Sequence, residues 1–264
     1  MIMELSLTNK TAVICGSSQG IGFAAAIELA NLGTNCILLA RNEKSLQLAV
    51  EQLPTTSGQK HHYAVADFTD TAAVYTVINE ITASQPIHIL INNSGGPKAG
   101  PISAAAGSEF SEAFQQHLIN NQNLVNAVLP GMRKDNYGRI INIISTSIKT
   151  PLAGLGVSNT IRAAVAAWAK TLANEIGAYN ITVNNILPGL TETARLTSLL
   201  TGSAEKSGKS EEEVANELLS TIPLKRFGKA NEVANMIAFL ASPAAAYVHG
   251  VSIPVDGGRT PSLT

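Results

Sequence analysis

Three glycines near the N-terminus are spaced as in loops that hold phosphate groups. Gly16, Gly20 and Gly22 follow a short apolar run at residues 11–15 and begin a helical pattern. In this context Gly16 permits a sharp turn, Gly20 lets the backbone approach a pyrophosphate, and Gly22 allows close packing of helix on strand. The free N–H groups and the dipole at a helix start favour an anion there. The alternative is a purely structural turn between a strand and a helix.

The residues at the end of the second apolar run indicate which dinucleotide would bind. A carboxylate at that place binds a ribose 2′-hydroxyl, whereas an arginine accommodates a 2′-phosphate. The chain has Arg41 there, followed by Asn42 and Glu43, and we interpret Glu43 as a first-turn helix acid. The guanidinium of Arg41 pairs well with phosphate oxygens, and Ser17 or Ser18 could add hydroxyl donors. The pattern favours NADP over NAD.

Short β-branched runs alternate with longer helical patterns, which predicts βαβ units and a parallel sheet. The strand segments are nearly continuous in apolar residues, as burial on both faces requires. We predict strands at residues 11–15, 34–40, 62–66, 87–92, 139–144, 181–186 and 251–254. We predict helices at residues 21–31, 43–52, 71–83, 109–133, 156–176 and 231–241, with Gly33 as a helix end and Asp70 and Ser111 as helix starts.

Three further motifs accompany the glycine loop in order along the chain. They are Asn92-Asn93-Ser94-Gly95, Pro188-Gly189-Leu190-Thr191-Glu192-Thr193 and Ile253-Pro254-Val255-Asp256-Gly257-Gly258. Together with the loop they resemble the short-chain dehydrogenase/reductase family over nearly the whole chain, in a pattern similar to that of 3-oxoacyl-acyl-carrier-protein reductases. The resemblance implies an α/β fold with a Rossmann-type, doubly wound parallel sheet of seven strands. We see no linker and predict a single domain over residues 1–264.

The same resemblance implies the residues that would hold the cofactor. Asp67 falls where the family contacts the adenine ring, and the segment 188–193 falls where it meets the nicotinamide carboxamide. The predicted cofactor-binding set is Gly16, Ser17, Ser18, Gly20, Ile21, Gly22, Arg41, Asp67, Phe68, Asn93, Ser94, Gly95, Arg162, Pro188, Gly189, Thr191 and Thr193.

The residues expected at the reacting centre depart from the family pattern. In the family a serine orients the reacting oxygen, a tyrosine exchanges the proton, and a lysine four residues later holds the ribose. Ser145 falls at the serine position, with Thr146 or Ser147 as substitutes if the register shifts, and Ser158 and Arg162 stand where the family has tyrosine and lysine. Arg162 can still hydrogen-bond ribose hydroxyls, but its pKa above about 12 prevents proton exchange. The Ser158 hydroxyl needs an adjacent base, so the usual acid is missing.

Two other residues are candidate proton donors. His117 falls near the position of a family asparagine, and a histidine can titrate near neutral pH. Lys149 lies in a loop expected at the mouth of the site, and a desolvated lysine can donate a proton. The plainer alternatives are a hydrogen-bonded helix histidine and a solvated loop lysine.

The segment 191–225 differs in composition from the rest of the chain. It is richer in Thr, Ser, Lys and Glu, with Gly202 and Gly208 as soft points. Such a segment between the sixth strand and the last helix predicts a mobile lid over a substrate. The alternative is a pair of ordinary surface helices.

Charge and composition argue against several classes of protein. A formal charge of −1 with mixed signs offers no electrostatic argument for nucleic acid or an anionic membrane. We see no signal peptide and no apolar stretch of the roughly 18 residues that a membrane-spanning helix needs. Cys15 and Cys36 fall on two predicted strands, and we expect buried thiols. The expectation is a cytoplasmic protein without a metal site.

The sequence therefore predicts an NADP(H)-dependent oxidoreductase that acts on a small-molecule carbonyl/alcohol pair with non-standard catalytic residues. The alternative is a member that binds a dinucleotide but is catalytically weak or inactive and serves as a sensor, scaffold or partner subunit. A third class is an unrelated reaction in the same pocket, such as dehydration or isomerisation. The family resemblance also implies a homodimer or homotetramer through the helices at 109–133 and 156–176, where the small apolar stretch 164–173 contains Trp168.

Overall fold

Seven parallel strands form one sheet in the order β3-β2-β1-β4-β5-β6-β7. The structure, a computed structural model, describes residues 3–262. Its strands are β1 (Thr11–Cys15), β2 (Asn35–Ala40), β3 (His62–Val65), β4 (Ile89–Asn92), β5 (Gly138–Ile143), β6 (Ile181–Pro188) and β7 (Ser252–Val255). The chain starts in the middle of the sheet, runs to one edge and then crosses to the other side. This is the doubly wound Rossmann-type α/β arrangement, and the predicted fold class is confirmed.

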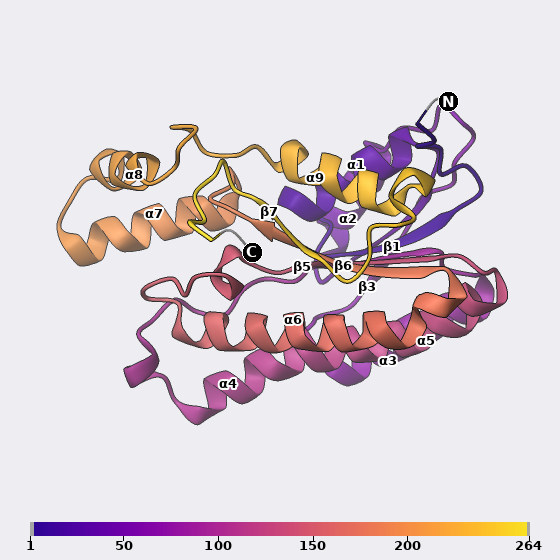
Figure 1. The fold of residues 1–264 in the computed structure, drawn as a ribbon, viewed down its shortest axis with the longest axis horizontal. Helices are drawn as coiled ribbons and strands as arrows, with labels where there is room; N and C mark the ends of the chain where they lie inside the picture. The colour runs from indigo at the N-terminus through magenta and orange to yellow at the C-terminus, as the bar shows by residue number, and fades with distance from the viewer. Residues whose placement is uncertain (1–2, 263–264) are drawn as a thin grey trace.

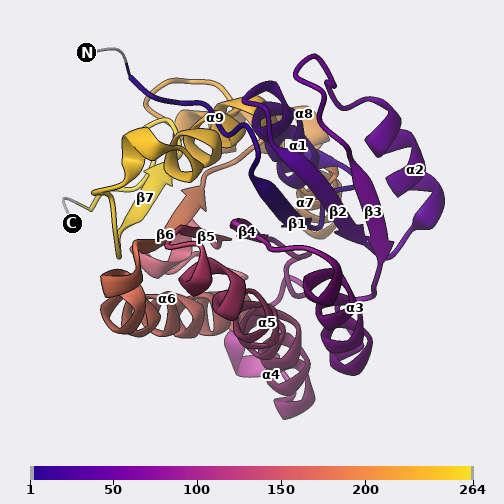
Figure 2. The same cartoon turned by 90° about the vertical axis from the view of Figure 1, so that its right-hand side faces the viewer.

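Helices cover both faces of the sheet, as Figure 1 and Figure 2 show. α1, α2 and α9 lie on one face, and α3, α5 and α6 lie on the other. The bounds are α1 (Gly20–Asn31), α2 (Glu43–Glu51), α3 (Thr71–Ser84), α4 (Gly107–Phe114), α5 (Asn120–Lys134), α6 (Gly156–Ile176), α7 (Ala194–Ser207), α8 (Glu211–Ser220) and α9 (Ala230–Ala241). None of the helices in the described part of the chain combines the length and apolar character that a membrane crossing requires.

The sheet separates two apolar clusters, one for each layer of helices. Ala12 and Ile14 of β1 enter the cluster that contains α1 and α9, whereas Val13 and Cys15 enter the cluster that contains α5 and α6. This alternation is what a strand buried on both faces produces. Cys15 and Cys36 are free, buried thiols, as predicted, and burial raises the pKa of Cys15 to about 12.

The prediction of one long helix at residues 109–133 is wrong in one respect, because the α-helix is interrupted. Between α4 and α5 the backbone forms a π-helical segment, Gln115–Ile119. Such a segment inserts an extra residue into a helix and occurs frequently at functional sites. Here it contains His117, whose side chain is only 1% exposed.

Of the two predicted helix starts, Asp70 is confirmed and Ser111 is wrong. Asp70 caps α3, as predicted, because its carboxylate accepts hydrogen bonds from the N–H groups of Ala72 and Ala73, each at 3.0 Å. Ser111 is not a helix start, since it lies inside α4. There the Glu109 carboxylate accepts the N–H of Ala106 at 2.8 Å, which takes over the capping role.

Three buried asparagines connect the central strands through their side chains. The Asn92 amide donates to Asn142 Oδ1 at 2.8 Å, and the Asn142 amide donates to Asn185 Oδ1 at 2.9 Å. These residues are direct partners in the register of β4, β5 and β6. The chain of bonds ends at Ser252 of β7, whose hydroxyl accepts from Asn185 at 3.0 Å. We call these residues the asparagine ladder.

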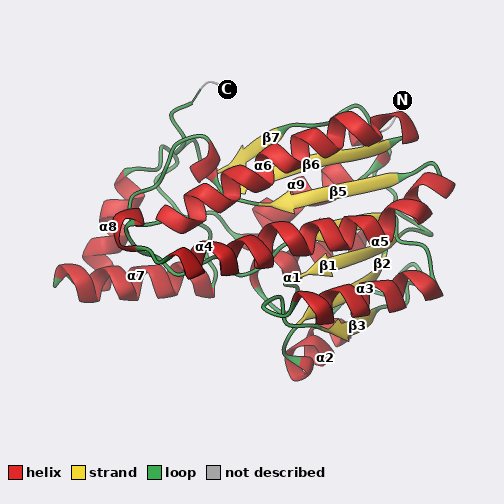
Figure 3. Cartoon of the chain, turned by 90° about the horizontal axis from the view of Figure 1, so that it is seen from below, coloured by secondary structure: helices red, strands yellow, loops and turns green. Residues whose placement is uncertain are grey.

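The segment 191–225 forms α7 and α8, which contact one another. Figure 3 shows both helices beyond the end of the sheet toward which the strand arrows point. A parallel sheet gathers its ligand-binding loops at that edge.

Candidate functional site

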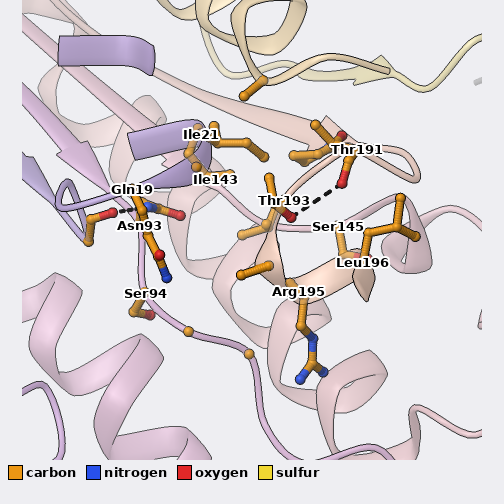
Figure 4. A pocket seen from close by; sticks show the side chains of 18 of the residues that line it. Gln19, Ile21, Asn93, Ser94, Ile143, Ser145, Thr191, Thr193, Arg195 and Leu196 are labelled. Atoms are coloured by element: carbon orange, nitrogen blue, oxygen red, sulfur yellow. Dashed lines mark hydrogen bonds between the residues drawn. The ribbon is translucent and has the colours of Figure 1, made fainter. Parts of the chain in front are cut away.

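A cavity of about 1160 Å³ opens at the carboxyl edge of the sheet. Its walls come from the loops after β1, β2, β3, β4, β5 and β6 and from the first turns of α6 and α7. The loops after β1 and β4 belong to neighbouring strands from which the chain turns in opposite directions, which is where open α/β sheets bind ligands. Figure 4 shows part of this wall, with Ile21 and Asn93 near one another and Ser145 and Arg195 on another side.

The glycine loop is held by Asn93. The Asn93 amide donates to the carbonyl oxygens of Cys15 and Gly16 at 3.2 and 3.1 Å. Gly16 has a φ of +59°, and a Cβ there would lie 2.8 Å from the Asn93 carbonyl oxygen. A Cβ on Gly22 would lie 2.3 Å from the Gly16 carbonyl oxygen. Both positions therefore require glycine, in agreement with the interpretation of this segment as a phosphate-binding loop.

The start of α1 faces the cavity without a protein cap. Gln19 is the N-cap residue, but its side chain makes no capping hydrogen bond. Gly20 and Ile21, which begin the helix, line the cavity. A helix leaves its first N–H groups without partners inside the helix, and its dipole adds partial positive charge there. This donor set fits a phosphate group.

The far end of the cavity carries Arg41, Asp67 and Phe68. Asp67 accepts the N–H of Thr69 at 2.9 Å, and this bond, with a smaller contribution from Arg41, holds the pKa of Asp67 below its usual value. Arg41 is exposed, so its guanidinium can meet a ligand phosphate.

Ser17 corrects one prediction of a cofactor contact. Its side chain is 0% exposed and is absent from the cavity wall, whereas Ser18 lines it. The Ser17 hydroxyl donates to the Ile14 carbonyl at 2.7 Å and accepts the Leu39 N–H at 3.0 Å. These two bonds tie β1 to β2 and leave the hydroxyl nothing to offer a ligand.

Ser145, Ser158 and Arg162 meet at the same wall of the cavity. Ser145 begins a short 3₁₀ helix, Thr146–Ile148, and its Oγ accepts the Ser147 N–H at 3.1 Å. Thr146 also lines the cavity, but Ser147 does not. Ser158 and Arg162 lie one turn apart on α6, so they share a face. Arg162 is 8% exposed and donates from Nη1 to the Ile143 carbonyl at 3.0 Å, which fixes it to the end of β5.

His117 is near this centre but does not act as an acid. Its Nδ1 shares a hydrogen bond of 2.7 Å with the Ser94 hydroxyl, and its buried Nε2 has no partner in the described structure. Burial, and then the charge of Arg162, lower the pKa of His117 to about 2. His117 is therefore neutral near pH 7, which contradicts the hypothesis that it titrates there.

Lys149 also fails as a proton donor by its position. It lies just beyond the 3₁₀ helix and is absent from the cavity wall. Among residues 3–262, the wall contains no tyrosine, histidine, lysine or cysteine. The structure thus places no group with an ordinary pKa between about 6 and 11 at the reacting centre.

Several wall residues were missed by the sequence analysis, and Arg195 is the most prominent. It begins α7, inside the predicted lid, and donates from Nη2 to the Pro97 carbonyl at 3.0 Å. The other missed residues include Gln19, Gln116, Leu152, Leu155, Leu199 and Arg259. The sequence signal that could have identified Arg195 is its positive charge, two positions after the predicted cofactor contact Thr193.

The sheet, the glycine loop and the uncapped helix start define a dinucleotide-binding α/β protein of the Rossmann type. A family model described as enoyl-(acyl carrier protein) reductase matches residues 16–260. The 3-oxoacyl-[acyl-carrier-protein] reductase FabG of Pseudomonas aeruginosa is 33% identical over 258 residues, which cover 96% of this chain and 98% of that protein. The chain belongs to the short-chain dehydrogenase/reductase family.

Solved structures agree in fold over nearly the full length. The L-sorbose reductase of Gluconobacter frateurii, crystallised with NADPH and L-sorbose, has a TM-score of 0.92 and 31% identity, with 99% of this chain and 100% of that chain covered. YwfH, an NADPH-dependent reductase of bacilysin biosynthesis, has a TM-score of 0.92 and 28% identity, with 97% and 100% covered.

Proposed function

We propose that the chain is an NADP(H)-dependent oxidoreductase that interconverts a carbonyl group and an alcohol, with Ser158 and Arg162 in place of the usual tyrosine and lysine. The observation that carries the proposal is the cavity itself. The same cavity is lined by the uncapped start of α1 and by Ser145, Ser158 and Arg162. The NADPH-dependent reductases among the similar structures support the choice of cofactor.

Each part of the cofactor has matching residues on the wall. The start of α1 and Thr193 would hold the pyrophosphate, Arg41 and Ser18 the 2′-phosphate, and Asp67 and Phe68 the adenine. The nicotinamide end would meet Ser94, Gly95, Pro188, Gly189 and Thr191, and Arg162 would donate to the ribose hydroxyls. When bound, the nicotinamide supplies or accepts the hydride.

The residues of the chain act on the oxygen of the substrate. The hydroxyls of Ser145 and Ser158 hydrogen-bond that oxygen and stabilise the negative charge that develops on it during reduction. The proton that completes the alcohol comes from water, because the described wall carries no tyrosine, histidine, lysine or cysteine. General acid catalysis typically contributes about 10²–10⁴-fold, so turnover is slower than with a tyrosine by about that factor.

In this proposal the segment 191–225, which contains α7 and α8, forms a lid over the substrate. Leu196 and Leu199 of α7 line the cavity, and Arg195 reaches across to the loop after β4. An apolar wall on a segment that contacts the opposite loop suits closure over a substrate.

A second candidate function is a dinucleotide-binding protein that is catalytically weak or inactive and acts as a sensor or partner subunit. The specific observation in its favour is the missing proton donor on the described wall. Both functions require the cofactor, so they differ only in turnover.

The deciding experiment has two stages. The first titrates NADPH and NADH by fluorescence, and binding of neither contradicts both functions. The second follows NADPH oxidation over a broad set of ketones and 3-oxoacyl thioesters. Reduction that falls in Ser158→Ala but not in Ser147→Ala, a buried serine off the cavity wall, supports the oxidoreductase. Tight NADPH binding without reduction of any compound supports the sensor.

The expected setting of this function is a cytoplasmic homodimer or homotetramer. Two free, buried thiols suit a reducing compartment. The small exposed residues Ala163 and Ala167 of α6, near Trp168, leave room for a closely packed partner helix. Sedimentation velocity would give the mass, and a monomer at micromolar concentration would contradict this part of the proposal.

A further inference from the structure

The side chains of Arg162 and Arg195 both come close to Gly96, and all three residues line the cavity. A Cβ placed on Gly96 would lie 3.7 Å from Arg195 Nη2 and 3.9 Å from Arg162 Nη2, so both guanidinium groups converge on the space beside this glycine. Arg162 is buried on α6, and Arg195 is exposed at the start of α7. Each donates to one backbone carbonyl, of Ile143 and Pro97 respectively. A guanidinium has five N–H donors, so most of theirs are free.

Neither arginine has a carboxylate partner. The described residues 3–262 contain three ion pairs, and none includes Arg162 or Arg195. The carboxylates on the cavity wall are Asp67 and Glu192. Asp67 is stabilised by Arg41, and Glu192 interacts with Arg226.

A smaller cavity of about 220 Å³ adjoins Gly96 and contains Glu109 and Glu112. These carboxylates do not pair with the arginines either, and Glu109 is bonded to the Ala106 N–H. No carboxylate among residues 3–262 therefore forms an ion pair with the positive charges beside Gly96.

Such an arrangement is unfavourable unless a ligand completes it. A buried charge such as that of Arg162 is normally paired, and the like charge of Arg195 nearby adds to the cost of leaving it unpaired. Burial and, to a smaller extent, the charge of Arg195 lower the pKa of Arg162 to about 10, so Arg162 remains charged at pH 7. A ligand that carries negative charge would remove the repulsion and use the free N–H donors.

The phosphates of the cofactor have other partners. The start of α1 and Arg41 serve them at the opposite part of the wall. In Figure 4 the Arg195 side chain extends from α7 away from Ile21, which marks the start of α1. Ser158 lies one turn before Arg162 on the same helix face, so the arginine pair lies next to the serines that would hold the reacting oxygen.

We propose that the substrate carries a carboxylate, which Arg162 and Arg195 bind together beside Gly96 while its carbonyl or alcohol oxygen faces Ser145 and Ser158. This inference rests on the proposed oxidoreductase function and names its substrate class, an oxo acid or hydroxy acid. Gly96 contributes by leaving the space between the arginines open, because it has no side chain. Arg195 is a specificity-determining residue in this arrangement.

Matched acid and ester pairs test the proposal. NADPH oxidation is measured with 2-, 3- and 4-oxopentanoate and with the methyl ester of each. We expect kcat/KM for at least one acid to exceed that of its ester by about tenfold or more, the size of a charge-assisted hydrogen bond. In Arg195→Met this ratio falls toward one. The control is Lys206→Met, which removes one positive charge from the other end of α7, off the cavity wall, and should keep the wild-type ratio.

Calorimetry gives a readout that does not depend on turnover. Pentanoate and the neutral pentanamide are titrated into the wild-type protein with and without NADP⁺, and pentanoate should bind more tightly. Esters reduced as well as their acids, or pentanamide bound as well as pentanoate, would overturn the carboxylate site. Failure of NADPH to bind would instead overturn the proposed function, and the titrations without NADP⁺ would then decide the carboxylate site separately.

Discussion

Ser94 and His117 are joined by a hydrogen bond of 2.7 Å between the Ser94 hydroxyl and His117 Nδ1. Ser94 follows β4 and lines the cavity, whereas His117 lies in the π-helical segment behind it. The bond couples the cavity wall to a histidine that the fold keeps neutral. His117 is therefore a positioning residue for the loop after β4, and its burial has a consequence for stability.

We expect His117 to make the protein sensitive to acid. Its pKa is about 2 in the folded chain and about 6.5 in the unfolded chain, so only the unfolded state gains a proton between these values. The free energy of unfolding should therefore fall as pH decreases below about 6.5, by about 2 kcal/mol at pH 5.

Urea denaturation at pH 7.5 and pH 5 measures this effect. His117→Asn removes the titrating group and should flatten the dependence on pH, while His62→Asn, an exposed position on β3, serves as the control. An equally steep loss of stability in His117→Asn and in the wild type would show that another group is responsible.

Arg41 should decide between NADPH and NADH. Arg41→Ala removes the cation at the end of β2, so NADPH should bind about tenfold or more weakly, as expected for one lost charge-assisted bond. NADH lacks the 2′-phosphate and should bind as before. The measurement is fluorescence titration of both cofactors, with Lys44→Ala on α2, off the cavity wall, as the control. An unchanged ratio of the two affinities in Arg41→Ala would contradict the assignment of Arg41.

Restoring the family acid should accelerate the reaction. The double variant Ser158→Tyr with Arg162→Lys places a phenol and an ammonium group one turn apart on α6. The phenol can deliver the proton that otherwise comes from water, so kcat should rise by about 10²–10⁴-fold on a neutral ketone that the wild type reduces. A plateau in the pH profile that ends at a new pKa would identify the phenol.

The comparison for this variant is Ser158→Phe, which adds the ring without the hydroxyl. A similar rise in Ser158→Phe would attribute the gain to packing. No rise in the double variant, with NADPH still bound, would mean that proton delivery does not limit the wild type.

Most of the fold could be predicted from the sequence, because central strands such as β1 are buried on both faces and are therefore apolar. The predicted bounds of β1 and α6 match the structure. The π-helical segment could not be predicted, since one inserted residue barely changes the apolar pattern of a helix. The burial of His117, which lies in this segment, was for this reason not predicted.

Site residues could be predicted where the course of the backbone requires a particular residue type. They could not be predicted where their role depends on the direction in which a side chain points. Gly16 and Gly22 follow from close approaches of the backbone that any glycine spacing of this kind implies. Ser17 faces β2 instead of the cavity, and nothing in a serine within a glycine loop indicates which way it points. Arg195 lies in the first turn of α7 and lines the cavity, a position that its residue type alone does not indicate.

The asparagine ladder should carry a large share of the stability of the central sheet. Asn142 is fully buried and bonds to Asn92 on one side and Asn185 on the other. Asn142→Ala would remove both bonds, open a small cavity and leave two buried amides without their partner. Each unsatisfied buried group costs about 1–3 kcal/mol, so we expect the free energy of unfolding to fall by about 2–5 kcal/mol.

Urea denaturation measures this free energy of unfolding. The control Asn79→Ala, on the exposed face of α3, should change it by less than about 0.5 kcal/mol. Asn142→Leu separates the two contributions, because it keeps about the same volume but loses both hydrogen bonds. A loss as small as that of Asn79→Ala in both Asn142 variants would mean that the ladder fixes the register of β4, β5 and β6 without stabilising them.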